Sequence, residues 1–380
     1  MNAALIRGAV EVPHTRSSSD STSQWLARAF DAVLRQHGLS ADEVDGLGVA
    51  SFTLKPDRCI DLAWRLGLRL SWSMDDSNGG VSGLNLLQHA VAAIETGQAR
   101  HIVLLAADAF QGQDFADLVA NYNRTTQLLL RPLGIANPNA LFALLTQRHM
   151  AKHGLERADY GRLVTLQRGH AMRNPLAVYR DLMSLDDYLG APLVAEPLGL
   201  YDCVPVVAGA DAILLSRADA VADRHGCVQV KAFKAMHNAD RHAGDGLRTG
   251  LHDIASALFA QAGRGPDDID LACVYDDYPV MALVQLEDLG LVGDRGVAHF
   301  VRDDLPSGRL AVNTSGGQLS VGQAGCAGGM HGLVEAIRQL GGRAGERQLA
   351  SARTAVVSGY GMVQYRYGMC ANATILEAVS

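Results

Sequence analysis

The sequence repeats one pattern of helix, glycine, acidic turn and strand, and this repeat constrains the fold more than any other feature. Gly38 matches Gly263, and Asp45 matches Asp270; the members of each pair are 225 residues apart. A repeat of this size with alternating helices and strands predicts two similar halves in an α/β fold with layered elements. The matched helices are expected at 21–36 and 254–261, and the matched strands at 46–51 and 271–276.

Each half also contains a glycine-rich loop that opens a further helix. Asn78 to Gly83 begins one such helix, and the segment from Gly316 to Gly329, which holds six glycines, precedes another. Free backbone N–H groups and the positive end of the helix dipole at such a start suit an anion or a developing oxyanion. The alternative is a tight turn where two backbones cross. In either case we expect the two helix starts to meet near the centre of the molecule.

The length of 380 residues allows two domains. We expect a first half at 1–220 and a second half at 221–380. The segment from about 114 to 197 is too long for a connection and too structured for a linker, so it is expected to be an inserted loop subdomain over the site.

Composition narrows the classes of function. The formal net charge of −7 argues against nucleic acid as the main partner. No segment has the length and apolarity of a membrane span, and Arg7 and Glu11 interrupt the N-terminal apolar run, so a cytoplasmic protein is expected. The six cysteines form no Cys-x-x-Cys pair, and His237 and His242 flank Asp240 at a spacing that does not favour one helix face. The sequence therefore predicts no metal site.

Four motifs, in this order along the chain, resemble the thiolase superfamily and in particular the thiolases related to sterol carrier protein. They lie at 200–212, 275–278, 285–290 and 313–322. The resemblance covers nearly the whole chain. It implies a duplicated thiolase fold, layered α-β-α-β-α, that forms a homodimer and acts on an acyl-CoA. The coenzyme A thioester would be the substrate, and no separate cofactor is implied.

The residues that carry thiolase chemistry are changed in this chain. The position of the family's nucleophilic cysteine falls on or next to Gly80, and the nearby Ser82 is a poor nucleophile without a positioned base. The family's His-Asp motif appears with Tyr275 in place of the imidazole, and its Gly-His pair appears as Gly322-Gln323. Covalent acyl transfer of the thiolase kind is therefore not expected.

Some thiolase-like proteins that lack this cysteine are retro-aldolases on steroid side-chain acyl-CoA, and they work with a small OB-fold partner, often with a zinc ribbon. The resemblance implies that Tyr275, assisted by Asp277, handles the substrate hydroxyl proton and that Gln323 stabilises the enolate. Those aldolases are expected to have a tyrosine where this chain has Gln323. Tyr360, expected in a loop between two glycines, is a further catalytic candidate. The candidate substrate-binding residues are Gly80, Ser82, Asn313, Gly316, Gly322 and Gly359.

Other interpretations stay open at this point. Tyr275 could be a packed strand-end tyrosine with a bonded hydroxyl. Asp276 and Asp277 should face opposite ways, with Asp276 structural and Asp277 free to face a site. The whole chain could be a non-catalytic scaffold that binds acyl-CoA or its small partner, or an acyltransferase that uses an atypical nucleophile.

Overall fold

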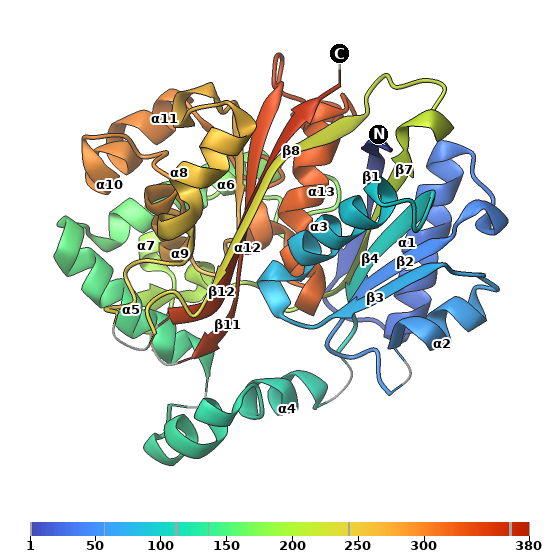
Figure 1. The fold of residues 1–380 in the computed structure, drawn as a ribbon. Helices are drawn as coiled ribbons and strands as arrows, with labels where there is room; N and C mark the ends of the chain where they lie inside the picture. Colours follow the sequence, from blue (N-terminus) through green and yellow to red (C-terminus); the bar gives the residue numbers. More distant parts are fainter. Residues whose placement is uncertain are drawn as a thin grey trace.

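In the described part of the chain, ten strands are hydrogen-bonded to one another in one continuous order, and each half of the chain contributes five of them (Figure 1). The computed structural model describes residues 2–56, 58–110, 113–135, 137–241, 244–364 and 367–379. The series runs β10-β9-β11-β12-β8-β1-β7-β4-β2-β3, and a single residue pair, Ile6 with Val228, joins the halves. The first half contains β1 (Ala4–Thr15), β2 (Gly46–Ala50), β3 (Trp72–Asp76), β4 (His101–Asp108) and β7 (Ala208–Arg217). The second contains β8 (Val228–His237), β9 (Leu271–Val274), β10 (Ala311–Val312), β11 (Thr354–Gln364) and β12 (Tyr367–Ala378).

Both halves arrange their strands in the same way. In each, the second strand in chain order pairs in parallel with the third and fourth, and the fifth pairs in antiparallel with the fourth. The fifth strand also pairs in antiparallel with the first. The expected boundary near residue 220 falls between β7 and β8, and the division into two domains there stays a prediction.

The aspartate of the repeated acidic turn makes equivalent hydrogen bonds in both halves. The carboxylate of Asp45 accepts hydrogen bonds from two backbone N–H groups at the start of β4, and that of Asp270 accepts two at the start of β11. Each carboxylate thus ties the turn before one strand to the start of its parallel neighbour. The four donors are Arg100, His101, Arg353 and Thr354.

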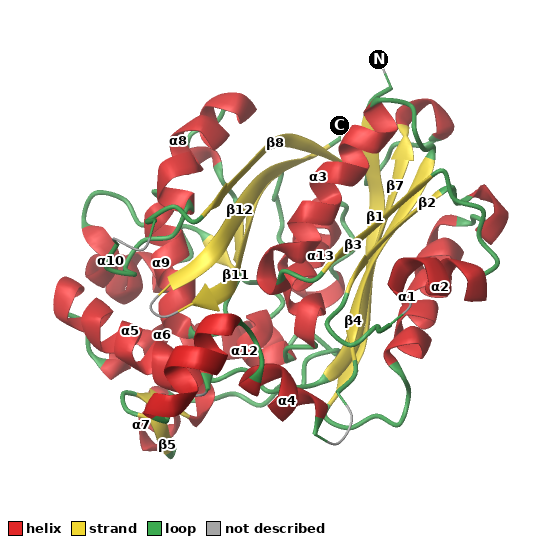
Figure 2. Ribbon diagram, turned by 60° about the horizontal axis from the view of Figure 1, so that its bottom comes forward, coloured by secondary structure: helices red, strands yellow, loops and turns green. Residues whose placement is uncertain are grey.

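Helices cover the strands on both sides and also lie between the halves. The outer helices include α1 (Thr22–His37), α2 (Arg58–Arg65), α8 (Leu251–Ala262) and α9 (Pro279–Asp288). As predicted, Gly38 and Gly263 end α1 and α8 in the left-handed conformation, with φ of 62° and 64°. Figure 2 shows α3 (Ser82–Glu95) and α13 (Gly328–Leu340) between the strands of the two halves, and both helices are largely buried. The expected layering of helices and strands is confirmed.

The segment between β4 and β7 is mainly helical. Its elements are α4 (Asp114–Ala120), a π-helical turn (Thr126–Leu130), α5 (Pro138–His153), α6 (Arg157–Ala171), α7 (Leu185–Gly190), β5 (Leu193–Ala195) and β6 (Leu198–Gly199). Among the described residues, no single helix is long and apolar enough to cross a membrane. The bent pair of segments Thr126–Leu133 and Pro138–His153 has the required length and apolar composition only when the two are taken together. The remaining short helices are α10 (Gly296–His299), α11 (Leu305–Ser307) and α12 (Gly317–Val321).

Two expected element bounds near the site are wrong. The strand expected to reach residue 276 ends at Val274, because the Asn313 side-chain amide bonds to both the N–H and the C=O of Val274 and replaces the next rung of the ladder. Tyr360 lies in a strand and not in a loop, because β11 continues as a hairpin with β12 in which Tyr360 pairs with Ala371.

The starts of α3 and α13 cross at the centre of the molecule, as expected from the two glycine loops. A Cβ on Gly83 would lie 2.6 Å from the carbonyl oxygen of Gly329, and a Cβ on Gly329 would lie 2.6 Å from that of Gly79. Both contacts are with backbone atoms that cannot rotate away. Glycine is therefore required at this crossing by close approach of the two chains.

We expect Gly83→Ala to lower the free energy of unfolding by about 2 kcal/mol or more, because the added methyl group overpacks the crossing. The matched control is Gly169→Ala in α6, where a Cβ meets no atom within 4 Å. There, the higher helix propensity of alanine should raise the free energy of unfolding by roughly 0.5–1 kcal/mol. Urea unfolding measures both values. Equal effects of the two substitutions would contradict the tight crossing.

Candidate active site

A cavity of about 300 Å³ lies between the segment that joins β4 to β7, here called the insertion, the loop after β9 and the strand β11. The insertion and the loop before it supply most of its apolar wall. Polar side chains reach it chiefly from the second half, where Tyr275, Asp277 and Gln323 line one part of its surface. A mostly apolar cavity with a few converging polar groups is the usual form of a small-molecule site. The apolar lining includes Phe52, Phe110, Phe115, Leu118, Leu130, Leu141, Phe142 and Val206.

Tyr275 and Gln323 are joined by a hydrogen bond. The side-chain amide of Gln323 donates to the Tyr275 hydroxyl oxygen at 2.8 Å, and the backbone of Gln323 is fixed by hydrogen bonds to Pro205 and Val207. Burial, and next the negative charge of Asp277, raise the pKa of Tyr275 well above its ordinary value of 10. The phenol is therefore neutral near pH 7. It accepts from Gln323 and keeps its own proton available for donation into the cavity.

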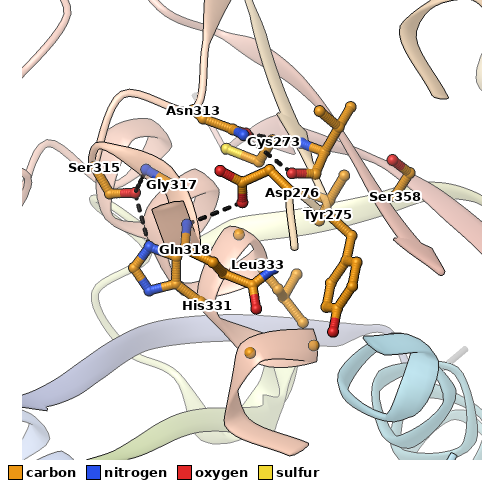
Figure 3. A pocket seen from close by; sticks show the side chains of 15 residues that line it. Cys273, Tyr275, Asp276, Asn313, Ser315, Gly317, Gln318, His331, Leu333 and Ser358 are labelled. Atoms are coloured by element: carbon orange, nitrogen blue, oxygen red, sulfur yellow. Dashed lines mark hydrogen bonds between the residues drawn. The ribbon is translucent and has the colours of Figure 1, made fainter. Parts of the chain in front are cut away.

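The two neighbouring aspartates face different surroundings, as expected. Asp276 accepts hydrogen bonds from the backbone N–H of Gln318 at 2.9 Å and from the Gln167 amide at 2.8 Å. Figure 3 shows its carboxylate directed toward Gln318, while the Tyr275 ring extends in another direction. Asp276 thus ties the loop after β9 to the start of α12, which is a structural role.

Asp277 lines the cavity, and its Oδ1 has no hydrogen-bond partner within the described part of the chain. Burial, followed by repulsion from Asp276, raises the pKa of Asp277 to about 8. A half-buried carboxyl group that has one oxygen without a partner and a pKa near neutrality is suited to general acid–base chemistry.

The resemblance places the position of the nucleophilic cysteine on or next to Gly80, and the structure leaves no room at Gly80 for a side chain. A Cβ on Gly80 would clash with the carbonyl oxygen of Tyr360 and would lie 2.6 Å from the ring of Tyr275. The Tyr275 ring thus fills the space next to Gly80 that a side chain would need. Glycine at position 80 and tyrosine at position 275 are therefore sterically linked.

Tyr360 lines the same cavity, but its hydroxyl is engaged. The Tyr360 Oη accepts a hydrogen bond from the backbone N–H of Gly368 across the β11–β12 hairpin, and the side chain is buried. Burial raises the pKa of Tyr360 well above its ordinary value. This geometry suits a residue of the cavity wall that stabilises the β11–β12 hairpin. The catalytic role of Tyr360 stays a prediction.

Of the ten predicted site residues, the structure brings five to the cavity surface and places five away from it. Those that line it are Tyr275, Asp277, Gln323, Tyr360 and Gly80. Ser82 is buried below the loop and donates to Asp76, and Asn313 caps β9. Gly316, Gly322 and Gly359 pack closely against Ala171, Val207 and the backbone of Gly80, respectively. Their predicted contact with substrate stays a prediction.

Sequence reasoning missed several cavity residues. Tyr122, Tyr278 and Cys203 line the cavity, together with the phenylalanines of the wall. The apolar residues of the segment before α5 could have indicated a cavity wall, since a segment that covers a site must direct side chains into that site. His242, weighed above as a metal ligand, lies outside the described residues.

Comparisons with known proteins place the chain in a family. The model of the thiolase C-terminal domain-like family matches residues 233–376. The 17-hydroxy-3-oxo-4-pregnene-20-carboxyl-CoA lyase of Mycobacterium tuberculosis is 32% identical over 362 residues, which cover 89% of this chain and 92% of that protein. The steroid side-chain-cleaving aldolase of Thermomonospora curvata is 29% identical over 359 residues, with 90% of each chain covered.

A solved structure agrees with these sequence relatives. The structure titled Ltp2-ChsH2(DUF35) aldolase matches 99% of this chain and 98% of its own, with a TM-score of 0.84 and 27% sequence identity. The similarity therefore extends over both halves and the insertion. The chain belongs to the thiolase superfamily, in the branch that includes the steroid side-chain-cleaving aldolases.

Proposed function

We propose that this protein cleaves a carbon–carbon bond of a β-hydroxyacyl-CoA by a retro-aldol reaction, without a covalent acyl-enzyme. The observation that carries the proposal is the group formed by Tyr275, Gln323 and Asp277 beside Gly80, which has no side chain. Oδ1 of Asp277 has no hydrogen-bond partner among the described residues. The names of the relatives, a lyase and an aldolase, support the same reaction class. The apolar wall suits a bulky hydrocarbon acyl group, such as the steroid side chain named for one relative.

In this mechanism Asp277 is the base. Its ionised carboxylate takes the proton from the β-hydroxyl group, the carbonyl of the released fragment forms, and the bond between the α and β carbons breaks. The electron pair of that bond passes to the α carbon and is delocalised onto the thioester oxygen as an enolate. Protonation of the α carbon then gives the shorter acyl-CoA. A pKa of about 8 leaves roughly a tenth of Asp277 ionised at pH 7, enough for an efficient base.

Tyr275 donates a hydrogen bond to the enolate oxygen and does not take the proton of the substrate hydroxyl. Because burial and Asp277 raise the pKa of its phenol, Tyr275 is a poor base and a suitable donor. The Gln323 amide donates to its oxygen and so leaves the phenol hydrogen to point at the substrate. A donor fixed in advance beside a developing oxyanion is among the strongest single contributions to catalysis.

The acyltransferase alternative needs an atypical nucleophile, and a thiol at the cavity is one candidate. Cys203 is the cysteine on the cavity wall among the described lining residues, and burial raises the pKa of Cys203 to about 12. A thiol with such a pKa is almost entirely protonated near pH 7 and is a weak nucleophile. The scaffold alternative gives no reason for a carboxyl oxygen, Oδ1 of Asp277, that is buried without a hydrogen-bond partner among the described residues, which is costly unless it is used.

A partner protein is part of the proposal. The solved aldolase named above carries two components in its title, and this chain matches one of its chains almost completely. Exposed Leu128, Leu129 and Leu133 in the insertion are apolar side chains that a partner could cover. A small OB-fold or zinc-ribbon partner, a homodimer and a cytoplasmic location are proposed together with the acyl-CoA substrate.

Tyr275→Phe should lower kcat/KM for a β-hydroxyacyl-CoA by about 10²- to 10³-fold, because it removes the proposed enolate donor and keeps the ring that packs on Gly80. The assay uses the protein co-expressed with its small partner and follows the released acyl-CoA. The control Tyr278→Phe, also in the cavity wall, should lower it less than about tenfold, since its hydroxyl bonds to Asn139. Unchanged turnover in Tyr275→Phe, or a fall explained by loss of stability, would remove this role.

The pH dependence should report Asp277. Because the base must be ionised and its pKa is raised to about 8, kcat/KM should rise by about tenfold per pH unit below pH 8 and level off above it. Asp277→Asn should abolish this rise together with the activity, whereas Tyr275→Phe should keep the rise at a lower rate. A flat profile between pH 6 and 9 in the wild-type protein would contradict Asp277 as the base.

A further inference from the structure

A second group of polar side chains lies away from the active site, where α5 packs against α9. His149 and His153 are one helical turn apart on α5, and Glu287 projects from α9. One nitrogen from each imidazole and one carboxylate oxygen lie within 4.8 Å of one another. Histidines four residues apart on a helix present both rings on the same face, which is a common arrangement of metal ligands.

The atoms that converge there lack hydrogen-bond partners. Nε2 of His149, Nε2 of His153 and Oε2 of Glu287 are all buried and make no hydrogen bond among the described residues. His153 Nε2 lies 3.3 Å from Glu287 Oε2, a spacing typical of two ligands on one tetrahedral ion. His149 itself is fully buried. Three converging, buried and unsatisfied atoms are costly unless something binds them.

The other side of His149 is already fixed. Its Nδ1 lies 2.8 Å from the hydroxyl oxygen of Tyr160. When Nδ1 donates to Tyr160, Nε2 presents its lone pair toward His153 and Glu287, and this orientation by an outer partner is usual for metal-bound histidine.

We infer that His149, His153 and Glu287 bind a divalent transition-metal ion of the zinc class, with water in the remaining position. Two imidazole nitrogens and one carboxylate oxygen are a donor set that Zn²⁺ accepts readily. The Lys152 ammonium group lies 3.7 Å from Glu287 Oε2 and competes for it, but its side chain is 34% exposed and can turn toward solvent. The signal for this group in the sequence is the His-x-x-x-His spacing of His149 and His153, which is independent of the cysteine spacing and of His237 and His242.

The position of this site suggests what the ion does. The same helix α5 lines the cavity through Leu141 and Phe142, and the Phe142 ring stacks on Tyr278 at 4.1 Å, immediately before α9. An ion held between α5 and α9 would join the insertion to the second half two helical turns from the cavity wall. It would stabilise that wall without taking part in the reaction, so the inference is independent of the proposed function.

Metal binding is measured on the purified full-length protein after removal of metals with a chelator. Titration with Zn²⁺, followed by calorimetry, should show one tight site per chain, and a saturating excess of Zn²⁺ should raise Tm by several degrees, by about 3 °C or more. Co²⁺ should give visible absorption bands of a nitrogen- and oxygen-bound ion. Strong sulfur-to-cobalt absorption would instead assign binding to cysteines and overturn the inference.

Two variants and one control identify the ligands. His153→Ala and Glu287→Gln each remove one ligand at a partly exposed position and should weaken Zn²⁺ binding by about 100-fold or more, beyond the loss usual for an outer-shell change. His252→Ala, an exposed histidine on α8, should leave affinity and Tm shift unchanged. Wild-type affinity in both ligand variants, or no stoichiometric binding by the wild-type protein, would overturn the site. Circular dichroism of each variant confirms that it is folded.

Discussion

The close crossing of two glycine-opened helices is the constraint on which the rest of this structure depends. Gly83 of α3 lies against the backbone of Gly329 in α13, and no side chain fits between them. This contact places the loop around Gly80 directly beside the loop that follows β9 and the strand β11. It also buries both helices between the two sets of strands, so that the loops of one half meet those of the other at one site.

The kind of reaction that the site supports depends on the Tyr275 side chain, which lies against Gly80. A cysteine cannot stand there because the Tyr275 ring and the backbone of Tyr360 are in the way. The same ring places a neutral phenol at the cavity, held by Gln323, and next to it Asp277 keeps a free oxygen. The site therefore combines a proton donor with a carboxylate of raised pKa, and together they suit bond cleavage through an enolate and not acyl transfer.

Sequence reasoning reached the features that local chemistry determines. The glycine helix ends, the correspondence of Asp45 with Asp270, and the separation of Asp276 from Asp277 could be predicted because each depends on residues near in sequence or on the repeat. The true length of β11 could not, since it depends on pairing with β12. Nor could the aromatic wall, because which face of the insertion meets the loops is decided by packing between distant segments.

The most direct test of the account is the fate of hydrogen at the α carbon. The protein, with its partner, is incubated with a β-hydroxyacyl-CoA in D₂O without added coenzyme A, and both products are analysed by mass spectrometry. Retro-aldol cleavage predicts a carbonyl fragment free of coenzyme A and a shorter acyl-CoA that carries one deuterium at its α carbon. Cleavage that requires free coenzyme A, or that leaves both fragments as thioesters, would contradict the account.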